Sequence, residues 1–242
     1  KCVAENLEQV IPLFAIDNYR PTLLNICLEI AKDSTMRNSR EMVKVYLPNV
    51  MKYLAKDLSK FTSEQESEDS FDPYWISDYV KILGLYDQKD SLLKYQHQLL
   101  ANTQIGYLRA STATEFLVLG LPLNQKLMDS INVNISQRGV LMRGLKEKKR
   151  EDLIAPRYKE QIEIGKIVVN DYMESEWDMQ SQQIDYLGQL TENNKKYLVY
   201  AFKTENDEQS YLSIYLPDDQ IKEWSYTYEN CYSDLEPFIG DW

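Results

Sequence analysis

The spacing of the apolar residues changes once along this 242-residue chain, and that change limits the possible folds more than any other feature. Up to about residue 175 the apolar residues recur every three or four positions, as they do on one face of an α-helix. Beyond Trp177 they alternate with polar residues, which is the period of a β-strand. We therefore predict a mainly helical protein, in which stacked helical hairpins precede a small α+β region.

Helical spacing recurs in short segments that Pro, Gly, Asp or polar residues separate. The segments cover residues 7–14, 24–31, 50–61, 76–83, 92–100, 105–116 and 123–131. Short connections between helices favour antiparallel neighbours, so these segments predict helical hairpins. Residues 62–70 contain no hydrophobic side chain and are expected to be a flexible loop, and residues 156–175 are expected to be a further helix.

An internal similarity makes the helical part more specific. Leu83-Gly84-Leu85 recurs 36 residues later as Leu119-Gly120-Leu121, and a fainter match relates residues 13–17 to residues 83–87 at an offset of 70. Stacked two-helix repeats produce offsets of this size, because each unit buries its apolar face against the next. The pattern resembles HEAT-type repeats, an α-solenoid. The alternative is a chance match between two leucine-rich helix ends.

Four segments near the C-terminus have the composition of strands. Residues 197–202 and 211–216 are rich in β-branched and aromatic side chains, and the polar link 205–208 between them predicts a hairpin. Residues 183–190 are a candidate third strand. Residues 224–228, which alternate aromatic and hydroxyl side chains, are a candidate fourth. We expect these strands to form an antiparallel meander that the preceding helix covers.

Charge is divided unevenly along the chain. Residues 1–150 carry 20 basic and 18 acidic side chains, whereas residues 151–242 carry 7 basic and 20 acidic ones. This asymmetry predicts a helical-repeat region at 1–150 and an acidic C-terminal region at 151–242. The junction 146–152 is a dense charged stretch, which fits either a docking patch or a solvated helix end. The net charge of −11 argues against nucleic-acid binding, since Lys and Arg make most phosphate contacts.

Few residues suit catalysis. His97 is the one histidine, and its place among apolar residues of a helical segment favours a packing role over that of a general base. Cys2, Cys27 and Cys231 are too scattered for a zinc site, although they leave one disulfide pairing open. The isolated glycines do not form a phosphate-binding loop. We expect no cofactor, no metal ion and no enzymatic activity.

Clusters of carboxylates do not change this expectation. Residues 64–69 and Asp218-Asp219 lack the alternation and the turn glycine of a calcium loop, and both suit solvated loops. A pair of catalytic carboxylates needs only to be close in space, and the sequence does not single one out.

Aromatic residues crowd into the acidic C-terminal part. Tyr and Trp combine a large contact area with a polar tip, which suits protein interfaces and sugar-stacking surfaces. We take Trp224, Tyr226 and Tyr228 as candidate partner-binding residues, with a small aromatic core as the alternative. The function we expect is a non-enzymatic protein-interaction scaffold or an accessory module of a larger protein. The alternative is a carboxylate-dependent hydrolase or a carbohydrate-binding module that uses these aromatic and acidic residues.

A resemblance to one group of proteins adds to this interpretation. The order of residues 155–161, a helix, then residues 184–188, 196–203 and 211–214 resembles the end of the helical-repeat region in large secreted bacterial envelope proteins, some of which carry a TraB/GumN-like domain. The resemblance spans about residues 73–217. It implies a non-catalytic module that is exported from the cytoplasm.

Targeting signals add little to this picture. The chain begins with Lys1, so we expect a processed or excised piece, possible flanking domains and protein partners. We find no signal peptide and no apolar run of the roughly 18 residues that a membrane span needs.

Overall fold

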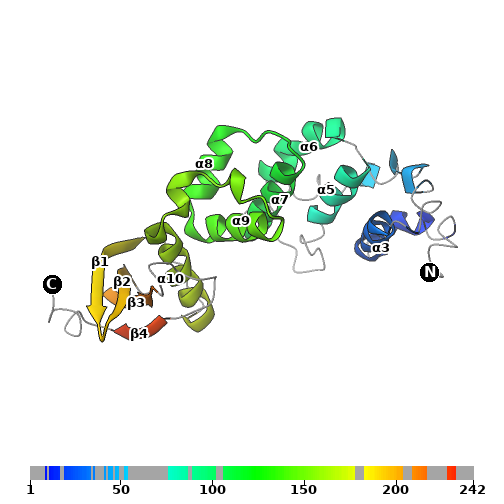
Figure 1. Ribbon diagram of the computed structural model, residues 1–242. Coiled ribbons are helices and arrows are strands. Elements are labelled where there is room, and N and C mark those ends of the chain that lie inside the picture. The colour runs from blue at the N-terminus through cyan, green and yellow to red at the C-terminus, as the bar shows by residue number, and fades with distance from the viewer. Residues whose placement is uncertain are drawn as a thin grey trace. The chain divides into compact units, whose positions relative to one another are not determined.

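A computed structural model of the chain describes residues 9, 11–16, 19–33, 35, 41, 43–45, 47–48, 52–53, 76–86, 89–101, 106–177, 183–203, 209–216 and 228–232. These residues belong to two compact units, which we call unit 1 (Lys1–Asn124) and unit 2 (Gln125–Trp242). Helices dominate the described part, and an antiparallel sheet forms near the C-terminus (Figure 1). The predicted fold class, mainly α with a C-terminal α+β region, is therefore confirmed.

Unit 1 is helical throughout its described part. Its elements are η1 (Ile11–Ala15), α3 (Arg20–Lys32), α5 (Ile76–Leu85), α6 (Lys89–Ala101) and α7 (Gly106–Val118). η1 packs against α3, α3 against α5, and α5 against α7, while α6 contacts both α5 and α7 (Figure 1). The helix expected at residues 7–14 is a 3-10 helix where it is described, and most of residues 50–61 and all of 62–70 lie outside the described residues.

Glycine allows the close approach of α5 and the end of α7. A Cβ atom on Gly84 would lie 2.6 Å from the side chain of Leu119, so only a glycine fits without movement of that leucine. The buried faces of the same helices supply the core, with Leu83 of α5, Leu92 of α6 and Phe116 of α7 excluded from solvent. The two Leu-Gly-Leu segments of the sequence thus meet in the folded unit.

The two segments nevertheless have different structural roles. Gly84 lies inside α5, whereas Gly120 follows α7 with a φ of 72°, in the left-handed region that favours glycine. The Leu121 N–H donates to the Phe116 carbonyl and the Gly120 N–H to the Leu117 carbonyl, which is a Schellman end of a helix. Because the shared motif does not align equivalent positions, the HEAT-like repeat remains a prediction.

Unit 2 combines helices with a sheet. Its helical elements are α8 (Gln125–Val133), α9 (Ile135–Glu147), η4 (Glu151–Leu153), η5 (Pro156–Lys159) and α10 (Gln161–Trp177). α8 packs against α9, α9 packs against α10, and α10 packs against the sheet (Figure 1). The side chain of Asn134 accepts a hydrogen bond from the Gln137 N–H and so caps the start of α9. α10 is the central layer of this unit.

The sheet is an antiparallel meander in the order β1-β2-β3-β4. Its strands are β1 (Ile184–Glu192), β2 (Lys195–Lys203), β3 (Gln209–Tyr215) and β4 (Tyr228–Tyr232). The first three strands and the β2–β3 pairing confirm the predicted strands. Of the candidate fourth strand, residues 224–227 lie outside the described residues, and Tyr228 is the first residue of β4.

Two glycines set the spacing of the layers around α10. A Cβ atom on Gly139 of α9 would lie 2.8 Å from Ile167 of α10. On the other side, a Cβ atom on Gly165 of α10 would overlap the hydroxyl of Tyr200 in β2, and that hydroxyl donates a hydrogen bond of 3.0 Å to the Ile162 carbonyl. The Ile167 side chain therefore approaches the backbone of α9, and the Tyr200 side chain the backbone of α10, more closely than a Cβ atom would permit.

The observed division of the chain differs from the boundary predicted at residue 150. That boundary falls inside unit 2, because the core around α10 contains Ile135 and Met142 of α9 together with residues of the sheet. Net charge reports which side chains face solvent, whereas the division depends on which apolar faces pack together.

Candidate functional site

The structure leaves the aromatic candidates of the C-terminal part open. Trp224 and Tyr226 lie outside the described residues. Tyr228 is the first residue of β4, where its backbone pairs with Ile214, and its side chain is not among those described. The partner-binding role of these three residues stays a prediction.

His97 and Cys27 offer little chemistry in the structure. His97 lies within α6, as predicted, and its side chain lies outside the described residues. Cys27 is a buried free cysteine of α3, and burial raises the pKa of its thiol to about 12. Because the thiolate is the reactive form, Cys27 is suited to packing.

The first candidate surface is apolar and lies in unit 1. Leu13, Ile16 and Tyr19 have 36%, 46% and 53% of their area exposed, while Phe14 between them is buried. The Ile16 N–H donates to the Leu13 carbonyl (2.9 Å) and the Tyr19 N–H to the Ile16 carbonyl (3.1 Å). Side chains three residues apart lie nearly above one another in such turns, so these three form one row, which we call the apolar ridge.

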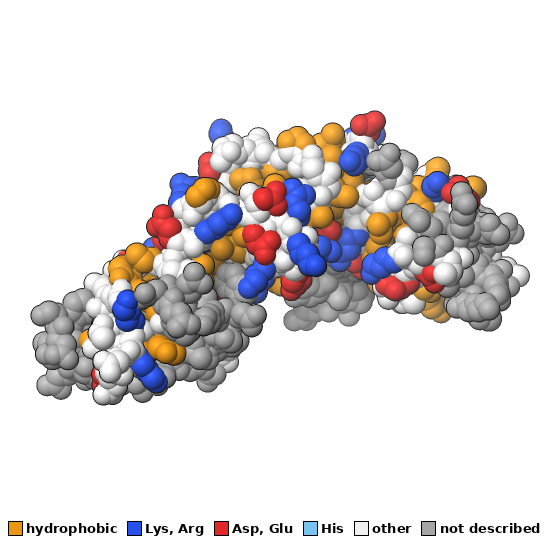
Figure 2. All heavy atoms as spheres, viewed as in Figure 1, with side chains coloured by type: hydrophobic (Ala, Val, Ile, Leu, Met, Phe, Trp, Pro, Cys, Tyr) orange, Lys and Arg blue, Asp and Glu red, His pale blue; other side chains and the backbone are white. Residues whose placement is uncertain are grey.

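A buried arginine holds this ridge in place. Arg20, at the start of α3, is almost fully excluded from solvent, and its Nη1 donates a hydrogen bond of 2.8 Å to the Phe14 carbonyl. The guanidinium also lies 5.2 Å from the centre of the Tyr53 ring, which is a cation–π distance. The backbone that carries the ridge is therefore fixed to α3. Hydrophobic side chains also show on the viewed face of unit 1 over α5 to α7 (Figure 2).

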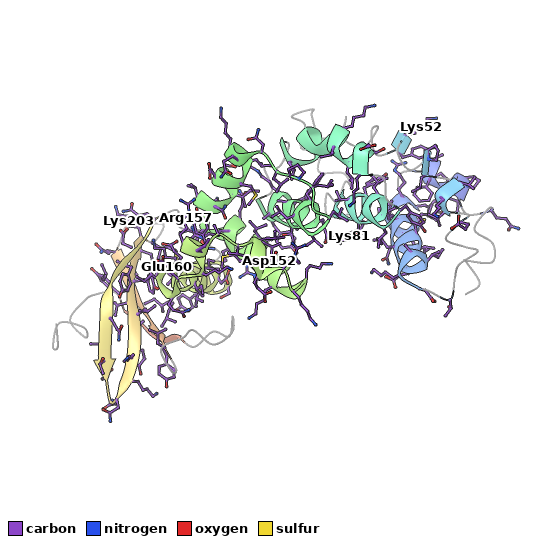
Figure 3. The ribbon with its side chains drawn as sticks, turned by 45° about the horizontal axis from the view of Figure 1, so that its top comes forward. Lys52, Lys81, Asp152, Arg157, Glu160 and Lys203 are labelled. Carbon is purple, nitrogen blue, oxygen red and sulfur yellow. The ribbon has the colours of Figure 1, made fainter. Side chains whose placement is uncertain are left out.

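The second candidate surface is basic and lies in unit 2, at the end of α9 and in η5. Lys146, Lys149, Arg157 and Lys159 are exposed there, and none of them forms an ion pair with a residue that the structure describes. Lys146 and Lys149 lie at the end of α9, whereas Arg157 stacks on Tyr158 beside Arg138, near the start of the same helix. Figure 3 labels Asp152, Arg157 and Glu160 in the same stretch between α9 and α10. Asp152 is held by Arg150, with 2.9 Å between its Oδ1 and the arginine Nε.

Lys149 adopts an unusual backbone conformation. It follows α9 with a φ of 56°, and the Arg150 N–H after it donates to the Leu145 carbonyl at 2.8 Å. Helices that end this way normally carry glycine or asparagine at the left-handed position. A lysine there costs about 1 kcal/mol of stability.

A third charged group is built into the core of unit 2. Arg138 of α9 is buried, and its Nη2 lies 2.9 Å from Oε2 of Glu163, which also pairs with Lys166 at 2.8 Å. The Tyr158 ring lies 5.1 Å from the Arg138 guanidinium and 4.5 Å from that of Arg157. Burial lowers the pKa of Arg138, and Glu163 partly offsets this shift. This group fastens η5 and α10 to α9.

Arg143 and Asp171 form a second pair between α9 and α10. Burial raises the pKa of the Asp171 carboxyl, whereas Arg143 acts in the opposite direction. The pair ties the same two helices together and is consistent with a structural role.

The described residues do not gather into a metal site. Within the described ranges there is no group of three or more His, Cys, Asp or Glu side chains that could hold a metal ion. Among the same residues, every helix is too short or too polar to cross a membrane. No protein-family model, curated protein or solved structure matches the chain, so the resemblance to envelope proteins stays a prediction.

Sequence reasoning had overlooked the apolar ridge. The spacing of Leu13, Ile16 and Tyr19 is visible in the sequence, but we assigned the other side of this segment, with Phe14, to a buried helix face. The junction at residues 146–152 was noticed as a charged stretch. Its left-handed lysine could not be foreseen, because a Lys-Lys-Arg run does not mark a left-handed residue.

Proposed function

We propose that this chain is a non-enzymatic protein-interaction module, in which unit 1 serves as a short HEAT-like scaffold. The apolar ridge carries this proposal. Single exposed apolar residues are common on protein surfaces, but adjoining ones more often mark a contact. In η1 and the turn after it the described exposed side chains, Pro12, Leu13, Ala15, Ile16 and Tyr19, are all apolar or aromatic.

The arrangement of unit 1 supports the same proposal. η1, α3, α5 and α7 contact one another in series, which is how helical repeats bury their faces. η1 presents apolar side chains to solvent on one side and packs against α3 on the other. A row of side chains spaced by three fits the groove of a helix, so we propose an amphipathic helix of a protein partner as the occupant.

The resemblance to envelope proteins supports a module of this kind outside the cytoplasm. It spans parts of both units and brings no catalytic residue with it. An accessory role beside a further domain of the parent protein is compatible with the same surface.

The test compares two variants of the full-length parent chain. Leu13, Ile16 and Tyr19 are changed to Gln together, and Val133→Gln is the control, because Val133 is 75% exposed and lies in unit 2. Neither change removes a buried side chain, so the melting temperatures should stay close to that of the parent. We expect a protein partner that the parent and the control capture, and that the ridge variant loses.

A captured protein counts only after purification and titration against all three chains. An affinity that falls at least about tenfold for the ridge variant, or 1.4 kcal/mol, supports the proposal. Equal affinity for the ridge variant and the parent would rule out the ridge as the docking site.

A further inference from the structure

We propose that residues 233–242 of this chain pack over the face of the sheet that points away from α10. We call these residues the C-terminal tail. The inference does not depend on the proposed function, because it concerns a surface within unit 2. We call that face the outer sheet face, and its central residues in β2 and β3 are Tyr197, Val199, Ala201, Tyr211 and Ser213.

The described residues cover only one face of the sheet. Leu198 and Tyr200 belong to the core around α10. Successive side chains of a strand point to opposite faces, so Val199 and Ala201 point away from that core. Tyr211 is the third buried residue of the cluster on the outer sheet face, and all three belong to strands. The cluster therefore contains no described helix residue.

The burial of Val199 shows that the outer sheet face is covered. Val199 is fully excluded from solvent, although its neighbours in register on the adjacent strands are the small residues Gly188 and Ser213. Tyr197 and Tyr211 are themselves buried, so their rings are not the outermost layer. The second face of an antiparallel sheet is commonly solvated. Burial of this extent indicates that a further segment of the chain lies over it.

The strand register places the start of the C-terminal tail beside the buried cluster. Tyr232, the last residue of β4, lies opposite Tyr211, which in turn lies opposite Ala201. The path from β4 to β1 crosses three strand spacings, or about 14 Å. Ten extended residues span about 33 Å, so the C-terminal tail is long enough to cross the whole face.

Composition favours the C-terminal tail over the shorter segments that lie outside the described residues. Residues 178–182 and 204–208 together contain a single hydrophobic side chain. The C-terminal tail contains four large ones, which are Leu235, Phe238, Ile239 and Trp242. These can supply the apolar layer that Val199 and its neighbours need.

Residues 217–227 are also rich in apolar side chains, but the register favours them less. They begin after Leu216, whose N–H donates to the Lys196 carbonyl, and end before Tyr228, which lies opposite Ile214. Both ends of this segment therefore lie at the end of β3 away from Tyr211. A cover from this segment would have to cross the face and return.

Two buried serines of β3 provide matched reporters for the test. Ser213 lies on the outer sheet face, whereas Ser210 lies opposite Phe202, on the face that α10 covers. Ser213→Cys and Ser210→Cys each introduce one small thiol into the full chain. The measurement is the rate at which an uncharged maleimide labels each position, followed by mass spectrometry of the peptides.

The reporters are compared in two variants with equal numbers of apolar residues replaced. The tail variant carries Phe238→Ser, Ile239→Ser and Trp242→Ser. The connection variant carries Ile221→Ser, Trp224→Ser and Tyr226→Ser. We expect the tail variant to accelerate labelling at position 213 at least about tenfold and to leave position 210 protected, because only the outer sheet face is opened. The connection variant should label both positions at the rate of the parent.

Several results would overturn the inference. One is faster labelling of position 213 in the connection variant but not in the tail variant, and another is no change in either variant. Labelling that slows as the protein concentration rises, with no effect of the tail variant, would assign the cover to a second copy of the chain. If the triple change prevents folding, Trp242→Ser alone is measured with the same reporters. Equal acceleration at both positions in that variant would also overturn the inference, since the C-terminal tail would then support both faces.

Discussion

The two units of this chain are held together in different ways. In unit 1, Lys32 pairs with Glu29 and Lys81 with Asp78, and in each pair the two side chains are three positions apart on one helix. In unit 2 the pairs of Arg138 with Glu163 and of Arg143 with Asp171 join different helices. The Arg138–Glu163 and Arg143–Asp171 pairs therefore connect α9 with α10, whereas the two pairs named in unit 1 lie along single helices.

The side chains that face the glycines also differ between the two units. Gly84 of unit 1 faces the end of a leucine side chain, which can rotate, whereas Gly165 of unit 2 faces the rigid ring of Tyr200. Packing in unit 1 can adjust to a change, and packing in unit 2 has little freedom to do so. Unit 1, whose packing can adjust and which exposes the apolar ridge, is suited to binding a partner. Unit 2, whose packing is rigid, is suited to holding charged side chains in fixed positions.

Gly165→Ala should have the largest effect. The added methyl group would overlap the Tyr200 hydroxyl and lie 2.5 Å from its Cζ, so α10 and β2 must separate. We expect a loss of about 3 kcal/mol in the stability of unit 2. Gly84→Ala should cost less than about 1 kcal/mol in unit 1, since Leu119 can turn away and alanine favours the helix. Hydrogen exchange of the amides in α10 and α5 measures both effects.

Combining Gly165→Ala with Tyr200→Phe tests the cause. Removal of the hydroxyl takes away the nearest overlap, so the double variant should lose less than the sum of the single variants. Additive losses would show that the clash does not involve this hydroxyl, and the contrast between the units would then have another origin.

Arg138→Met should cause the second-largest loss of stability. It keeps the length of the side chain but leaves Glu163 with Lys166 alone, and it removes the cation from the Tyr158 ring. We expect a loss of about 2 kcal/mol in chemical unfolding followed at unit 2. The control Lys81→Met removes an exposed pair on one helix and should cost less than about 0.5 kcal/mol. Similar losses in the two variants would show that an ion pair between helices contributes no more to stability than an ion pair along one helix.

How much of the fold can be predicted from the sequence depends on whether the contacts are local or join distant segments. Helices such as α3 and the β2–β3 hairpin follow from the period of nearby residues, and both were found from the sequence. The turn at Asn193-Asn194, with φ of 50° and 61°, belongs to the type that two-residue hairpins favour, and Asn at both positions was a usable indication of it. A local pattern was therefore sufficient wherever the structure is local.

Contacts between distant segments were not predictable in this way. No local sequence pattern predicts that Gly165 contacts Tyr200 or that Arg138 pairs with Glu163, because these residues lie far apart in the sequence. The division between Asn124 and Gln125 likewise depends on such contacts, and the charge boundary at residue 150 does not coincide with it.

Lys149→Gly should have a smaller effect of the opposite sign. Glycine relieves the left-handed backbone after α9, and we expect unit 2 to gain about 1 kcal/mol in chemical unfolding. Lys149→Ala is the control, because it removes the charge without relieving the backbone and should leave the stability nearly unchanged. A gain in both variants would mean that repulsion between the cations, and not the backbone conformation, opposes folding at this position.

The smallest effect on stability is expected for Trp224→Ala and Tyr226→Ala. The sequence predicts that both are surface residues that bind a partner, so truncation should change the melting temperature by less than the roughly 2 °C that 1 kcal/mol produces in a protein of this size. The two variants should bind less of any partner that the parent captures. A loss as large as that of Arg138→Met would assign these side chains to a core, and unit 2 would then lack the aromatic surface that the sequence predicts for it.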